Sequence, residues 1–140
     1  MKRNIVFIPN IDLGNGRNTP YHYSIKSWKH WCDANDVELI EWTEPITDVS
    51  KFKVTLQRYW VHDILQNSEI KYDQVLIVDA DTIIHPDTPN FFEETDGKFS
   101  VVVNNGCYEW TTRSIKEWGN AMFPTDPKVK PWQYFNGGFQ

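Results

Sequence analysis

Two carboxylates directly follow an apolar run in the middle of the chain. Residues 75–78 (VLIV) are all apolar and mostly β-branched, and Asp79, Ala80 and Asp81 come next. Residues i and i+2 of an extended segment point the same way, so Asp79 and Asp81 are expected to face one ion. Hard oxygen ligands of this kind suit Mg²⁺ or Mn²⁺ that arrives with a phosphate-bearing substrate. The pattern therefore predicts a metal site at the end of a buried strand.

The elements that must position this pair alternate between strands and helices. We predict strands over residues 5–8, 37–42, 74–78, 83–84, 100–103 and 132–140. Helices are predicted over residues 21–34, 51–66 and 114–122. This alternation indicates an α/β domain with a mixed, mostly parallel sheet flanked by helices, formed by residues 1–140. Ligands bind beyond the carboxyl ends of strands in open α/β sheets, which is where the two carboxylates fall.

Two of the predicted helices carry more detailed patterns. In residues 51–66 the apolar side chains expected to face inward are Leu56, Tyr59, Trp60, Ile64 and Leu65. In the last helix, Ser114 and Glu117 have the spacing of a capping box, which places the helix start at Ser114.

The first predicted strand is followed by a long polar loop over residues 10–20. Loops of this length in compact domains are often functional. The loop contains Gly14-Asn15-Gly16, which resembles the start of a dinucleotide-binding fingerprint. Thr19 stands where the third glycine is needed, and no helix follows at once, so we do not interpret the loop as such a site.

Composition excludes several classes of function. The net charge of −5 argues against a nucleic-acid-binding protein, because no basic stripe is present to neutralise phosphates. No apolar stretch has the length of a signal peptide or a membrane span, so we expect a cytoplasmic protein. Cys32 and Cys107 lack metal-ligand spacing and are expected to be buried thiols in a reducing compartment.

Three segments in order along the chain resemble glycosyltransferases of the GT-A fold, especially the family 8 and glycogenin-like type. Residues 72–82 (YDQVLIVDADT) look like the family's DxD segment. Residues 55–59 (TLQRY), in the helix before it, are similar to the family's Y-x-R helix. Residues 134–138 (YFNGG) are similar to its F-N-[SA]-G strand. The order and rough spacing fit nearly the whole chain.

The resemblance implies a metal-dependent hexosyltransferase whose donor is a nucleoside diphosphate sugar. A UDP-sugar is favoured, and a GDP-sugar is the other donor considered. Asp79 and Asp81 would hold Mn²⁺ or Mg²⁺, and Arg58 would approach the diphosphate or the sugar. The remaining implied donor-binding residues are Pro9, Asn10, Ile11, Ala80, Asn136, Gly137 and Gly138. Candidates for the catalytic residue are Asn136 and Arg58, and Glu109 and Asp126 are candidate bases for an inverting mechanism.

The chain also departs from the family. The third metal ligand, often a histidine, normally follows the F-N-x-G strand, whereas this sequence ends at Gln140. We therefore expect a minimal form without the C-terminal acceptor part, and the acceptor is not readable from the sequence. Slow donor hydrolysis is one consequence, and a non-catalytic module that only binds the nucleotide sugar is the alternative. An open sheet edge would also invite a second copy of the chain to cover it.

Two other families place acidic residues after a strand. A phosphatase of the haloacid dehalogenase type needs Thr or Val two residues after the second Asp, where Ile83 stands, and a later acidic pair that is missing after residue 100. A calcium loop starting at Asp79 would need an oxygen ligand and a glycine where Ile83 and Ile84 stand. The phosphatase fits less well than the glycosyltransferase, and the calcium loop does not fit.

Overall fold

The computed structural model describes residues 3–103, 106–122 and 130–140. The chain forms two compact units, Met1–Phe99 and Ser100–Gln140. The first unit is a small α/β layer structure and holds the strands. The second unit consists of a helix, a 3₁₀ turn and a short bridged segment.

The first unit alternates strands and helices in the order expected. Its strands are β1 (Asn4–Pro9), β2 (Glu38–Trp42) and β3 (Gln74–Ile77). Its α-helices are α1 (His22–Asn35), α2 (Val61–Asn67) and the short α3 (Phe91–Glu94). Two 3₁₀ helices precede the longer helices, η1 (Thr19–Tyr21) and η2 (Val54–Trp60).

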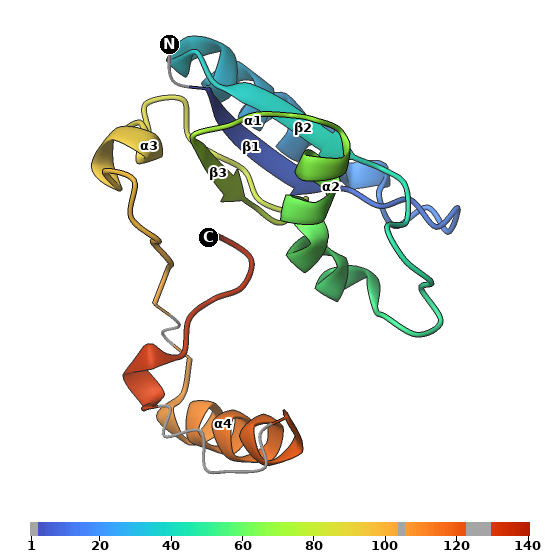
Figure 1. Cartoon of the computed structure of the whole chain (residues 1–140), viewed down its shortest axis with the longest axis vertical. Coiled ribbons are helices and arrows are strands. Elements are labelled where there is room, and N and C mark those ends of the chain that lie inside the picture. Colours follow the sequence, from blue (N-terminus) through green and yellow to red (C-terminus); the bar gives the residue numbers. More distant parts are fainter. Residues whose placement is uncertain (1–2, 104–105, 123–129) are drawn as a thin grey trace. The chain divides into compact units, whose positions relative to one another are not determined.

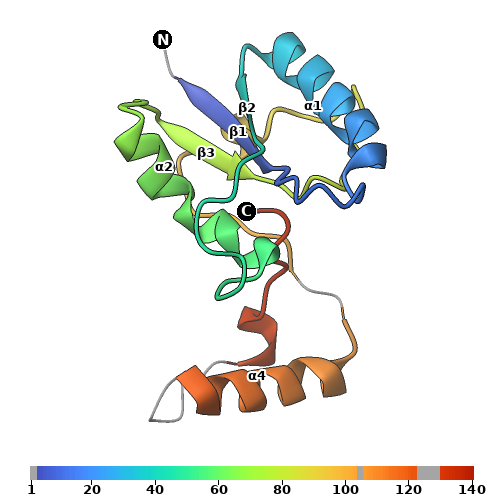
Figure 2. The same ribbon diagram turned by 90° about the vertical axis from the view of Figure 1, so that its right-hand side faces the viewer.

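The three strands form an open parallel sheet in the order β2-β1-β3. The chain passes from β1 to β2 on one side and then crosses back to β3 on the other side of β1. As a result, α1 covers one face of the sheet and α2 covers the opposite face (Figures 1 and 2). The mixed α/β architecture with helices flanking a parallel sheet is therefore confirmed, at the scale of this three-stranded sheet.

The central strand forms the core of this unit. Residues 5–8 of β1 have no exposed surface, because both neighbouring strands and both helices cover them. Ile5 and Phe7 face α2 and pack with Val61, Ile64 and Leu65. The alternate residues of β1 point to the other face, where α1 buries Trp28, Trp31 and Cys32.

The predicted helix over residues 51–66 differs from the structure in its first half. Residues 54–60 form the 3₁₀ helix η2, and only the following α2 is α-helical. A 3₁₀ helix repeats every three residues, so Val54, Gln57 and Trp60 share the inner face. Leu56 and Tyr59, which we predicted to face inward, are consequently exposed.

The polar residue Gln57 occupies the inward position at the centre of η2 because its amide bonds to backbone groups of the preceding connection. Its side chain is fully buried, and its Oε1 accepts hydrogen bonds from the backbone N–H groups of Ile46 (2.7 Å) and Thr47 (3.3 Å). Its Nε2 donates to the carbonyl oxygens of Thr47 (3.1 Å) and Phe52 (3.3 Å). Gln57 thus fastens the long connection between β2 and η2 to the body of the unit.

Three predicted strands are not strands in the structure. Residues 83–84 follow a turn, with Ile83 exposed and Ile84 buried. Residues 100–103 and 132–140 contain an isolated antiparallel bridge between Val103 and Phe135 in place of longer strands. Pro131–Gln133 forms the 3₁₀ helix η3, which removes the first residues of the predicted C-terminal strand from an extended conformation.

The last predicted helix begins earlier than expected. Helix α4 spans Tyr108–Met122, so Ser114 and Glu117 lie inside it and the predicted capping box is wrong. Cys107 precedes the helix, and its sulfur accepts hydrogen bonds from the backbone N–H groups of Glu109 and Trp110. Cys107 is exposed, which corrects the prediction of a buried thiol, whereas Cys32 is buried as predicted. Among the described residues, no helix has the length and apolarity needed to cross a bilayer.

Candidate functional site

A pocket of about 130 Å³ opens at the carboxyl ends of β1 and β3. The chain reverses direction across the sheet between these two strands, so their following loops diverge and leave a crevice. Such a switch point is where open α/β sheets bind ligands. The pocket is lined by Pro9, Asn10, Ile11, Leu13, Asn15, Arg17, Asn18, Tyr21, Val54, Thr55, Arg58, Asp79, Ala80 and Asp81.

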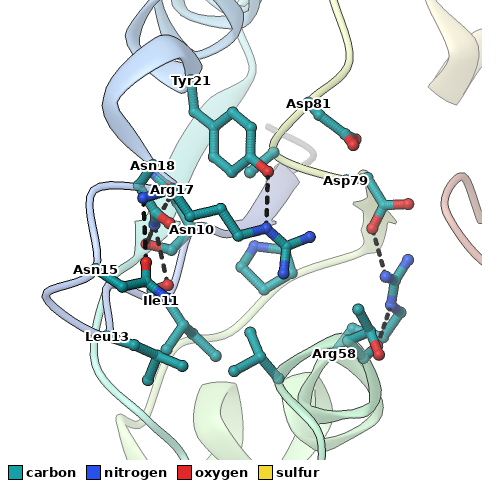
Figure 3. Close-up of a pocket in the computed structure, with 14 residues that line it drawn as sticks. Asn10, Ile11, Leu13, Asn15, Arg17, Asn18, Tyr21, Arg58, Asp79 and Asp81 are labelled. Atoms are coloured by element: carbon teal, nitrogen blue, oxygen red, sulfur yellow. Dashed lines mark hydrogen bonds and ion pairs between the residues drawn. The ribbon is translucent and has the colours of Figure 1, made fainter.

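The turn after β3 presents the two predicted metal ligands on one side of this pocket. In Figure 3, Asp79 and Asp81 lie opposite the loop that carries Arg17. The Asp79 side chain is about one-third exposed and Asp81 is exposed, so both carboxylates are open to solvent. Ala80 between them is buried, and it lies in the turn after β3 rather than in an extended segment.

Thr82 and Trp28 hold the acidic turn in place. The Thr82 hydroxyl donates to the backbone oxygen of Asp79 (2.7 Å), and the Thr82 N–H bonds to the same oxygen (3.2 Å). The indole N–H of the buried Trp28 donates to the Thr82 hydroxyl (3.0 Å). Helix α1 therefore holds the turn in place through Trp28, which is far from the turn in the sequence.

Arg58 reaches the pocket from η2 and pairs with the first carboxylate. Its guanidinium Nη2 contacts Oδ1 of Asp79, and its Nε donates to the backbone oxygen of Thr55 (2.8 Å). Arg58 is only 8% exposed, although it carries a full charge. A nearly buried cation needs a partner, and Asp79 provides it. The resemblance placed Arg58 near the diphosphate or the sugar, and the sequence did not predict this pair.

The loop after β1 is braced by Asn10 and Asn18. The Asn18 amide donates to the backbone oxygen of Asn10 (3.0 Å), to its side-chain Oδ1 (2.7 Å) and to the backbone oxygen of Ile11 (3.0 Å). The Asn10 amide in turn donates to Glu41 on β2 (2.6 Å). Asn10, implied by the resemblance to hold the base, thus uses both ends of its side chain to shape the loop.

Two tight turns carry Arg17 back towards the pocket. Asp12 Oδ1 accepts the N–H of Gly14 (2.8 Å), and Asn15 Oδ1 accepts the N–H of Arg17 (3.1 Å). Gly14 and Gly16 have φ values of 70° and 74°, a left-handed conformation that glycine adopts without steric cost. Arg17 Nε then donates to the Tyr21 hydroxyl (3.3 Å), as drawn in Figure 3.

Arg17 and Tyr21 are pocket residues that sequence reasoning missed. The length of the loop over residues 10–20 was the available signal, since it indicated a functional loop without naming the side chains that matter. Leu13, Asn15 and Asn18 of the same loop were missed for the same reason, because they match no motif and reach the pocket only when the loop folds back on itself. Val54 and Thr55 of η2 were also not predicted to line the pocket.

The remaining predicted site residues belong to the second unit. Asn136 Oδ1 accepts the N–H of Gly138 (2.7 Å), and the Asn136 N–H donates to the backbone oxygen of Val102 (2.9 Å). Asn136 therefore forms a turn next to the bridge between Val103 and Phe135. Gly137 is the middle residue of this turn. The candidate base Glu109 is exposed in the first turn of α4, and Asp126 lies outside the described residues.

The two carboxylates of the pocket are suitable ligands for a hard divalent cation. Asp79 and Asp81 supply carboxylate oxygens, and Mg²⁺ or Mn²⁺ commonly takes one or two carboxylates together with substrate phosphates. Within the described ranges, no group of three or more His, Cys, Asp or Glu side chains gathers to hold a metal. No known protein family, curated protein or solved structure matches this chain significantly.

Proposed function

We propose that this chain is a GT-A-like, metal-dependent glycosyltransferase domain that binds a nucleoside diphosphate sugar. The observation that supports this most directly is the meeting of Arg58, Asp79 and Asp81 in one pocket at the switch point between β1 and β3. Two of the three motif segments that resemble the family contribute these residues. A UDP-hexose is the first donor to test, with GDP-sugars second.

In this proposal the pocket receives the diphosphate end of the donor. Its volume of about 130 Å³ is below the roughly 300–1,000 Å³ of typical small-molecule sites, so the base and sugar extend beyond it. Asp81 and Asp79 hold Mn²⁺ or Mg²⁺, which neutralises charge on the leaving diphosphate when it is bound. Arg58, kept in place by Thr55, donates hydrogen bonds to a phosphate oxygen.

The role of Asp81 is tested by calorimetric titration of UDP and GDP with Mn²⁺ and then with EDTA. We expect one nucleotide to bind the wild type only with metal, and Asp81→Ala to lower that affinity at least about tenfold by removing a carboxylate ligand. Asp87→Ala is the matched control, because Asp87 is an exposed carboxylate outside the pocket. Equal binding by the wild type and Asp81→Ala would refute the assignment.

A non-catalytic nucleotide-sugar-binding module remains the second candidate. It is favoured by the fact that both carboxylates lining the pocket are assigned to the cation, which leaves neither as a base or nucleophile. Release of nucleoside diphosphate from a UDP-hexose, measured with and without Mn²⁺, separates the two functions. Metal-dependent release supports transfer or hydrolysis, whereas binding without release supports the module.

A further inference from the structure

The ion pair between Arg58 and Asp79 joins a residue proposed to bind phosphate to a residue proposed to bind the cation. Arg58 is nearly buried, and its Nε is held by the backbone oxygen of Thr55 at 2.8 Å. Asp79 is the carboxylate that its Nη2 contacts. A cation that takes the Asp79 oxygens therefore competes with the guanidinium, and an anion that takes the guanidinium competes with Asp79.

The charges around the pocket reinforce this competition. The charged side chains that line it are Arg17, Arg58, Asp79 and Asp81, which sum to zero at neutral pH. A divalent cation alone leaves Arg58 facing an added positive charge, and a diphosphate alone leaves Asp79 facing added negative charge. When both arrive, the cation replaces Arg58 at Asp79 and the diphosphate replaces Asp79 at Arg58.

We propose that the Arg58–Asp79 ion pair makes binding of a divalent cation and of a diphosphate mutually dependent, so that the pocket takes the pair and rejects each ligand alone. The coupling is reciprocal, because each ligand releases the partner that the other ligand needs. This inference rests on the proposed function, since it concerns the same site. It adds that Arg58 acts as an internal competitor of the metal.

The first test measures Mn²⁺ binding without any nucleotide, by electron paramagnetic resonance of the free ion. Arg58→Gln removes the competitor and is expected to raise the affinity for Mn²⁺ by about tenfold. Arg17→Gln removes one positive charge from the same pocket without touching the ion pair, and its effect is expected to stay within about threefold. Arg58→Lys keeps a cation beside Asp79 and should bind Mn²⁺ nearly as weakly as the wild type.

The second test measures pyrophosphate binding in EDTA, by calorimetry. Asp79→Asn releases Arg58 and is expected to raise the affinity for pyrophosphate by about tenfold. Asp81→Asn removes the same charge but leaves the ion pair intact, so its gain should be about threefold or less. Tryptophan near-ultraviolet circular dichroism of each variant verifies that its fold matches the wild type before binding is compared.

The outcomes separate this inference from the proposed function. Suppose that the wild type binds a nucleoside diphosphate with Mn²⁺, but Arg17→Gln raises Mn²⁺ affinity as much as Arg58→Gln does, and Asp81→Asn raises pyrophosphate affinity as much as Asp79→Asn does. The coupling is then overturned and the proposed function stands. The coupling is also overturned if Arg58→Gln binds Mn²⁺ more weakly than the wild type, or if neither the wild type nor Arg58→Gln binds Mn²⁺. If no nucleotide binds the wild type under any condition, the proposed function fails as well.

Discussion

At the scale of single residues, position in the fold gives identical side chains different properties. Cys32 lies on the buried face of α1, where burial raises the pKa of its thiol to about 12 and the nearby Asp33 adds to the effect. Cys107 is exposed, and hydrogen bonds from the backbone N–H groups of Trp110 and Glu109 lower the pKa of its thiol. The thiolate is the reactive form of cysteine, so the two residues should differ sharply in reactivity.

We predict that iodoacetamide modifies Cys107 in the native protein and spares Cys32. The rate at Cys107 should reach half its maximum at a pH below that of a free cysteine, because its lowered pKa makes thiolate available earlier. Peptide mapping by mass spectrometry across pH 6–9 gives both rates, and urea-unfolded protein provides the reference. Faster modification of Cys32 in the folded chain would contradict the assignment.

At the scale of elements, η2 shows how one buried residue holds a helix in position. The inward face of a 3₁₀ helix repeats every three residues, and Gln57 occupies its centre with hydrogen bonds to the backbone of residues 46–52. The next residue, Arg58, then faces the pocket. The element that carries the phosphate-binding candidate is thus positioned by the buried amide beside it.

We predict that Gln57→Ala lowers the free energy of unfolding by about 2–3 kcal/mol, because buried backbone groups lose their partners. Gln66→Ala is the matched control, since Gln66 is exposed on α2 and should change stability by about 0.5 kcal/mol or less. Urea unfolding followed by tryptophan fluorescence measures both values. Equal losses in the two variants would show that the buried amide is not what holds the loop.

At the scale of the whole molecule, the sheet and its covering helices make stability depend on groups far from the pocket. Cys32 is buried against the sheet and stays protonated in the folded chain well above the pH at which a free thiol ionises. The unfolded chain therefore releases this proton first as pH rises. Since the folded state then binds more protons, its stability falls with increasing pH in that range.

We predict that ionisation of the Cys32 thiol in the unfolded chain lowers the free energy of unfolding by about 2 kcal/mol between pH 8 and pH 10. The loss begins near the thiol pKa of the unfolded chain and continues towards pH 12, and it is absent below pH 8. Urea unfolding at each pH should show that Cys32→Ala lacks this component. Cys107→Ala should keep it, because Cys107 is exposed and its thiol pKa is lowered rather than raised in the folded chain. Parallel pH profiles for the wild type and Cys32→Ala would contradict the prediction.

The sequence by itself determined the strands β1, β2 and β3, the helix α1 and the position of Asp79 and Asp81 at a strand end. These features follow from local periodicity and from the rule that parallel strands end at one edge of a sheet. It misplaced the weakly patterned parts, namely η2, the start of α4 and the short strands after residue 82, because few local side chains specify them.

Only the tertiary structure decided what surrounds the two carboxylates. The order β2-β1-β3 brings the loop with Arg17 and Tyr21 to the same pocket as Asp79, although about sixty residues separate them. It also pairs Arg58 with Asp79 and lets Trp28 hold the turn through Thr82. Contacts of this kind leave no pattern in a single sequence, because each residue type is ordinary where it stands and gains its role from a neighbour that the fold supplies.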